Sequence, residues 1–180
     1  MPRGVCILGL GVAWCAIASA CLGPGERRPT GGDAGPHDAG PRPPPTPGPQ
    51  PVFPADLERT YTELRGCRES HEHELHFIRV LVSPSAIEPY QALSPDLPYP
   101  EGATLVKLEY DDDACSELVL YTAYRKLAPN ANLAGGDWLW QRVGPERDVI
   151  EEGAPWRCIN CHTYHCAPPY GYDLTCAEEL

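Results

Sequence analysis

The segment Ala103-Thr104-Leu105-Val106-Lys107-Leu108-Glu109-Tyr110 decides the fold class, because its side chains alternate with the two-residue period of a β-strand. One face of the predicted strand carries Thr104, Val106, Leu108 and Tyr110. The other face carries Leu105, Lys107 and Glu109. The segment therefore predicts a strand with one apolar face, and with it a sheet.

Three further strands are predicted around this one. Residues 75–82 are rich in Phe, Ile, Val and Leu, and residues 117–125 form a second β-branched and aromatic run. Turn residues at 135–137, Gly-Gly-Asp, precede a strand in which Trp138, Trp140 and Arg142 share one face. These runs indicate a mainly antiparallel sheet.

Only short helices are predicted beside the sheet. Asp56 can cap a helix over Asp56–Arg65, in which apolar residues recur at helical spacing. Ser83 and Pro84 suit the N-cap and first position of a brief helix that Pro89 must shorten. The sequence then runs through Gly153-Ala154-Pro155 into the segment 158–162, and its tail is too rich in Pro and Gly for long elements. The predicted fold class is α+β, a mainly antiparallel β-sheet with short flanking helices.

The N-terminus has the pattern of an export signal. Arg3 is the only charge before Cys21, and residues 5–18 form an apolar run too short to span a bilayer. Ala18-Ser19-Ala20 before Cys21 suggests a lipoprotein signal over residues 1–20, with Cys21 as the lipidation site and Leu22 favouring the outer membrane. Ala18 stands where such signals usually have Leu, so plain secretion stays open.

Residues 21–54 are expected to be a disordered tether, because they are rich in Pro and Gly and nearly lack large apolar side chains. Asp-Ala-Gly-Pro occurs twice, at 33–36 and 38–41, and is interpreted as low-complexity spacer. Residues 55–180 have the length of one domain. The lipid would anchor this exported domain to the outer membrane, where the domain would face the periplasm or the cell surface.

The formal net charge of the chain is −11. An acidic chain is repelled by the phosphates of nucleic acids and by anionic lipid headgroups. The charge therefore argues against nucleic acid as a partner, and simple solubility is its plainest meaning.

The motif Cys158-Ile-Asn-Cys161-His162 has the spacing by which c-type haem is attached. Its two thiols can add to the haem vinyl groups, and the adjacent imidazole can ligate the iron. The cofactor predicted from these residues is haem c, with His162 as the proximal ligand.

The other axial ligand cannot be a methionine of the mature protein. Met1 is the only methionine and would leave with the signal. The distal position is therefore expected to be open, or to be filled by one of the domain's other histidines: His71, His73, His76 or His165. An open position binds small molecules such as nitric oxide, peroxide or hydroxylamine.

Four cysteines remain once the signal, the lipid site and the haem motif are set aside: Cys67, Cys115, Cys166 and Cys176. In an oxidising compartment an even number predicts two disulfides, with three possible pairings. The favoured arrangement has Cys166 or Cys176 reaching back to Cys67 and Cys115, so that the tail is fastened to the sheet.

Several segments, taken in order, resemble the cytochrome P460 family, which includes the β-sheet cytochromes c-prime. They are residues 76–84 (His-Phe-Ile-Arg-Val-Leu-Val-Ser-Pro), residues 99–108 (Tyr-Pro-Glu-Gly-Ala-Thr-Leu-Val-Lys-Leu), Gly136-Asp137-Trp138, the haem motif and Asp173. The resemblance covers roughly residues 75–173. It implies an antiparallel haem-binding domain that is often a homodimer through its sheet.

The resemblance gives Lys107 a role, because P460 proteins bond a lysine in this context covalently to the porphyrin. The alternative is an ordinary solvated strand lysine. P460 enzymes also carry a pocket carboxylate on the next strand, where residues 118–126 contain no acid. Either Glu109 or Glu117 substitutes for it, or the proton acceptor is absent. Arg125 is a candidate to hydrogen-bond a distal ligand if it points inward, and is otherwise a solvated charge at the end of its strand. The resemblance also implies a possible oxidoreductase activity and a periplasmic electron-transfer partner.

Two other functions are kept open. Cys158, Cys161, His162, His165 and Cys166 fall within nine residues and have the donor types of a structural zinc site. A haem-free module for surface binding, with its cysteines wholly in disulfides, is the third possibility.

Overall fold

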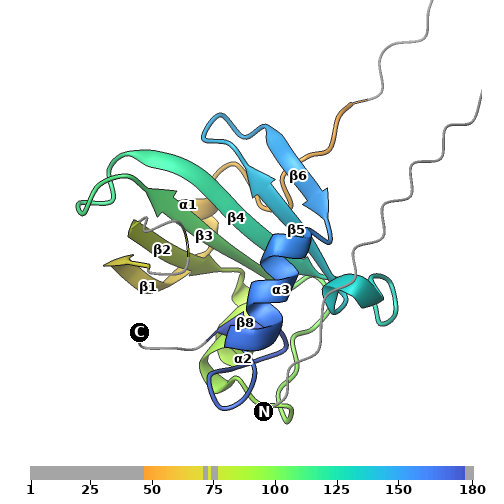
Figure 1. Cartoon of the computed structure of the whole chain (residues 1–180). Coiled ribbons are helices and arrows are strands. Elements are labelled where there is room, and N and C mark those ends of the chain that lie inside the picture. The colour runs from red at the N-terminus through yellow and green to blue at the C-terminus, as the bar shows by residue number, and fades with distance from the viewer. Residues whose placement is uncertain (1–46, 71–72, 74–76, 177–180) are drawn as a thin grey trace, which may run out of the picture. The chain divides into compact units, whose positions relative to one another are not determined.

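The computed structural model describes residues 47–70, 73 and 77–176. These residues form a six-stranded antiparallel sheet, a small two-stranded hairpin and a few short helices, which confirms the predicted α+β class (Figure 1). The signal, Cys21 and residues 21–46 of the expected tether lie outside the described residues. In the described part, no helix has the length and apolar character needed to cross a membrane.

The six strands follow one another across the sheet in chain order, so each pairs with the next along the sequence. They are β1 (Thr62–Glu69), β2 (Phe77–Val82), β3 (Thr104–Tyr110), β4 (Leu118–Lys126), β5 (Trp138–Val143) and β6 (Val149–Gly153). The separate hairpin consists of β7 (Gly171–Tyr172) and β8 (Thr175–Cys176). The α-helices are α1 (Leu57–Thr60), α2 (Ile87–Ala92) and α3 (Trp156–His165), and the 3-10 turns are η1 (Pro84–Ala86) and η2 (Leu133–Gly135).

Strand β3 lies inside the sheet and separates two hydrophobic cores. Val106, Leu108 and Tyr110 pack in one core with the segment before β1, as the alternation predicts. Leu105 packs in the other core with Trp138 and Trp140, beneath α3 and the β7–β8 turn. Both faces of β3 are therefore covered, and its charged residues Lys107 and Glu109 point into a covered face rather than into bulk water.

The helix predicted over Asp56–Arg65 is wrong in length. Helix α1 ends at Thr60, and β1 begins at Thr62. Thr62 pairs with Val82 of β2, so cross-strand hydrogen bonds replace the helical ones. Asp56 does not cap the helix with its side chain; instead its carboxylate accepts a hydrogen bond from Arg59. Pairing with β2 outweighs the local helical pattern.

Helix α3, which covers ten residues including Cys158, Cys161 and His162, was not predicted, whereas the described tail after it forms only the short strands β7 and β8. Pro and Gly flank this segment, with Pro155 at its N-cap, and none lies inside residues 156–165. Strand β6 was not predicted at all. Pro89, expected to shorten its helix, lies instead in the first turn of α2, where a missing N–H breaks no helical hydrogen bond.

The folded domain begins before Ala55. Val52 and Phe53, assigned to the tether from composition, are buried in the core that contains Val106. The Val52 N–H donates to Gln141 Oε1 at 2.8 Å. The tether therefore ends earlier than expected, because two apolar residues suffice to dock the chain on the sheet.

Two disulfides form, but the favoured pairing was wrong. Cys67 of β1 bonds to Cys115 in the β3–β4 loop, and Cys166 after α3 bonds to Cys176 of β8. The Cα atoms of the two pairs lie 5.9 and 4.4 Å apart. The sheet brings the first pair together at one end, and the second pair closes the tail on itself.

We expect a C67A/C115A double variant to lose roughly 3–4 kcal/mol of unfolding free energy, because this disulfide closes the longer loop, with a sequence separation of 48. A C166A/C176A variant opens a loop with a separation of only 10 and should lose less. Urea unfolding of both variants measures the difference. The reverse ranking would contradict the prediction.

Candidate functional site

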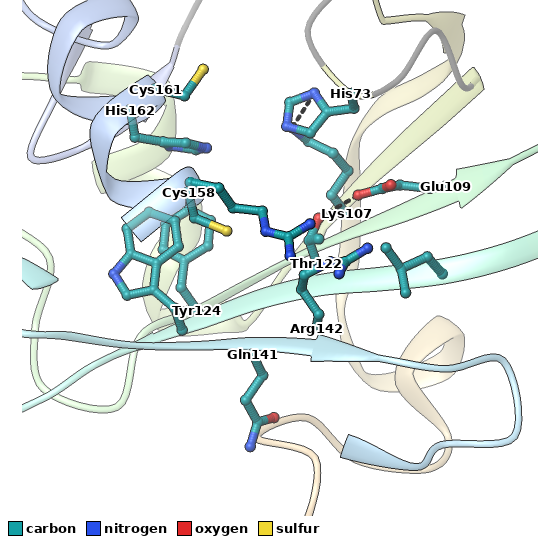
Figure 2. A pocket seen from close by; sticks show the side chains of 13 residues that line it. His73, Lys107, Glu109, Thr122, Tyr124, Gln141, Arg142, Cys158, Cys161 and His162 are labelled. Atoms are coloured by element: carbon teal, nitrogen blue, oxygen red, sulfur yellow. Dashed lines mark hydrogen bonds between the residues drawn. The ribbon is translucent and has the colours of Figure 1, made fainter. Parts of the chain in front are cut away.

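Helix α3 presents Cys158, Cys161 and His162 to the sheet. Residues three and four apart lie on one side of a helix, so Cys158 lies beside both of the others. Neither cysteine belongs to one of the two disulfides. The three residues line a cavity between α3 and strands β3, β4 and β5 (Figure 2). The structure therefore places the whole predicted motif on one cavity.

The cavity has a volume of about 200 Å³, and a smaller one of about 80 Å³ adjoins it. Five residues line both cavities: His73, Lys107, Tyr124, Cys161 and His162. The walls of the larger cavity combine aromatic and aliphatic side chains with a few polar groups, as ligand sites usually do.

The His162 ring is held in one orientation. Its Nδ1 lies 2.7 Å from the carbonyl oxygen of Leu174, so Nδ1–H donates and Nε2 keeps its lone pair. Trp140 and Tyr124 pack edge-on against the ring, with centroids at 4.9 and 5.8 Å. Burial, with a contribution from Lys107, lowers the pKa of His162 to about 4. The imidazole is therefore neutral at pH 7, which is the form that ligates metals.

The Leu174 carbonyl is itself held by the sheet. Lys126 Nζ contacts Asp173 Oδ2 at 2.7 Å and donates to the Gly136 carbonyl at 3.0 Å. Trp138 Nε1 donates to the Asp173 carbonyl at 3.1 Å. These contacts tie the β7–β8 turn to β4 and β5. His162 is thus oriented from the sheet through a partner of the kind that supports metal-ligating histidines.

Lys107 is not an ordinary solvated strand lysine. Its Nζ lies 2.6 Å from Nε2 of His73, within the cavity (Figure 2). Burial lowers its pKa to about 8, against the opposing effect of Glu109. Lys107 faces the cavity because β3 alternates, with Leu108 on the far side.

Of the predicted polar site residues Glu109, Glu117 and Arg125, only Glu109 lines the cavity. Glu109 is 4% exposed, lines the cavity and accepts a hydrogen bond from Thr122 Oγ1 at 2.7 Å. Arg125 is exposed and lies on the opposite face of β4 from Thr122, so it does not face the cavity and has the place of a solvated strand-end charge. Glu117 is also exposed and does not line the cavity.

Two arginines that line the cavity were not predicted as site residues. Arg142 of β5 and Arg157 of α3 line the cavity and lie 3.9 and 3.8 Å from Glu151. Arg142 was placed on the face of Trp140 from its spacing, but nothing in the sequence showed that a site covers this face.

The histidine candidates also separate. His73 lines both cavities, whereas His165 is exposed and lines only the smaller one. His71 and His76 lie outside the described residues.

The zinc alternative loses one of its ligands, because Cys166 is in a disulfide. Across residues 47–70, 73 and 77–176, no three His, Cys, Asp or Glu side chains are grouped to hold a metal ion. A thiol-redox use of the C-x-x-C pair is also disfavoured. Burial raises the pKa of Cys158, whereas reactive thiols have a lowered pKa.

The residues present fit a covalently attached haem. Two cysteines outside the disulfides and one neutral imidazole lie on a single helix face, above a partly aromatic cavity, and that imidazole keeps its Nε2 lone pair. No protein-family model and no curated protein matches the chain.

Proposed function

We propose that this domain is an exported c-type haem protein that binds or redox-transforms a small nitrogen or oxygen species. Cys158 and Cys161 would hold the porphyrin as thioethers, and His162 would ligate the iron. The observation that carries the proposal is the hydrogen bond from His162 Nδ1 to the Leu174 carbonyl, which leaves Nε2 as a ligand. The resemblance to the cytochrome P460 family supports it.

Bound haem would supply an iron that coordinates nitric oxide, peroxide or hydroxylamine. The chain supplies polar groups to the same cavity. Glu109 is a carboxylate that can accept a proton from a bound molecule, and its hydrogen bond from Thr122 holds it in place. The acid that β4 lacks is thus present on β3.

The setting of this function is part of the proposal. Lipidation at Cys21 would keep the domain at the outer membrane, where a periplasmic redox partner exchanges electrons with it. Pairing through the sheet would give a homodimer, as in the family that the chain resembles.

The test is the mass and colour of the full chain, produced in a host that matures c-type cytochromes. We expect a mass increase of one haem and a Soret band that survives denaturation. Colourless protein of unmodified mass would reject the proposal and favour a haem-free binding module.

A further inference from the structure

Two imidazole rings face one another across the cavity, His162 from α3 and His73 from the turn before β2 (Figure 2). Their centroids lie 6.4 Å apart. Two imidazoles that ligate one metal, each with nitrogen about 2 Å from it, have ring centres roughly 6 Å apart. The spacing of this pair matches that of two axial ligands on one iron, and with an interplanar angle of 75° it also lies in the range of a T-shaped aromatic pair.

The contacts of His73 allow one tautomer that leaves Nε2 available to a metal. Its Nδ1 lies 2.8 Å from Ser70 Oγ, which can accept a hydrogen bond from Nδ1–H. Lys107 Nζ lies 2.6 Å from Nε2 and 3.1 Å from Nδ1, so it contacts both ring nitrogens and does not by itself fix the tautomer. In the tautomer that donates to Ser70, the lone pair lies on Nε2.

His73 and His162 thus share one arrangement. The Nδ1 atom of each ring lies within hydrogen-bonding distance of a protein oxygen, at 2.8 Å from Ser70 Oγ in His73 and at 2.7 Å from the Leu174 carbonyl in His162. Ser70 is only 6% exposed, so this acceptor is held within the fold. Oxygen acceptors on Nδ1 orient metal-ligating histidines and increase the basicity of Nε2.

Open space lies along this pair of rings. Both cavities are lined by His73 and by His162. The other described candidate, His165, is exposed and lines only the smaller cavity.

We propose that His73 is the second axial ligand of the haem iron in the resting protein, and that an incoming small molecule must displace it. The proposal rests on the proposed function and deepens it, since the distal position then exchanges between His73 and the ligand.

The experiment compares the haem-loaded full chain with H73A and H165A by electron paramagnetic resonance and absorption spectroscopy. We expect the ferric wild type to be six-coordinate and low-spin, and H165A to match it. H73A should be high-spin, and added imidazole should restore the low-spin spectrum.

A wild type that is already high-spin and unchanged by H73A would overturn the proposal, as would a spin change in H165A alone. Intact mass separates this failure from that of the proposed function, because haem would still be attached. If H73A does not fold, S70A provides the test. Loss of the Nδ1 acceptor should weaken the iron–His73 bond and raise cyanide affinity about tenfold; unchanged cyanide affinity would count against the proposal.

Discussion

A C158A/C161A double variant, produced in a host that matures c-type cytochromes, is expected to carry no thioether-linked haem. Each thiol would add its S–H across one haem vinyl group, so without the sulfurs no thioether bond to the porphyrin can form. Both cysteines lie outside the disulfides and line the cavity with His162. The expected effect is complete loss of thioether-bound haem, measured by intact mass and by the Soret band after denaturation.

The single variants C158A and C161A act as internal controls. Each keeps one thioether, so haem should stay attached while the absorption bands shift to the red, because one vinyl group remains conjugated with the ring. C67A/C115A is the matched control, since it removes two cysteines that line neither cavity and should retain haem. Covalent haem in C158A/C161A would show that other residues hold the porphyrin.

The resemblance to P460 proteins implies a covalent bond between Lys107 and the porphyrin, which would shift an absorption band of the ferrous haem to the red. Replacing Lys107 by Leu is expected to abolish this shifted band. The amine of Lys107 lies inside the cavity, 2.6 Å from His73 Nε2, where a haem edge would be within reach. Burial lowers its pKa to about 8, so a deprotonated, nucleophilic fraction exists near neutral pH. A bond from this nitrogen to a ring carbon removes one hydrogen from each atom, and a two-electron oxidant such as peroxide is consumed.

Lys107→Arg is the matched control for this experiment. Arginine keeps the length and positive charge of the side chain, but its guanidinium stays protonated and is a poor nucleophile. Both variants should therefore lose the band, and a haem-linked proteolytic peptide containing Lys107 should be found in the wild type alone. Identical ferrous spectra for all three proteins would exclude the cross-link.

Local patterns predicted the central strands well. The alternation in residues 103–110 correctly separated Val106 and Leu108 from Lys107 and Glu109, because successive side chains of a strand must point to opposite faces. The spacing of Trp138, Trp140 and Arg142 was informative for the same reason. The failures fall where pairing partners decide, as in β1, which forms against β2 although its start has a helical pattern.

Counting the cysteines predicts the number of disulfides but not which cysteines pair. The number of cysteines left over predicted two bonds, but which pairs form depends on which Cα atoms the fold brings within about 7 Å. The contact of Arg125 with a distal ligand could not be judged from the sequence for a related reason. The sequence predicted its strand but not which face of that strand is covered.

The sequence by itself determined the residue types of the site and their order. It supplies two thiols and an imidazole at one-turn spacing, an alternating central strand and no methionine beyond Met1. Tertiary structure alone decided that Lys107, Glu109 and His73 meet His162 in one cavity, and that Leu174 and Ser70 orient the two imidazoles. The cavity joins residues far apart along the chain, because α3 packs on the sheet and brings His162 to the residues of β3. The Lys107–His73 contact spans 34 residues and the His162–Leu174 contact 12, whereas the Ser70–His73 contact is local.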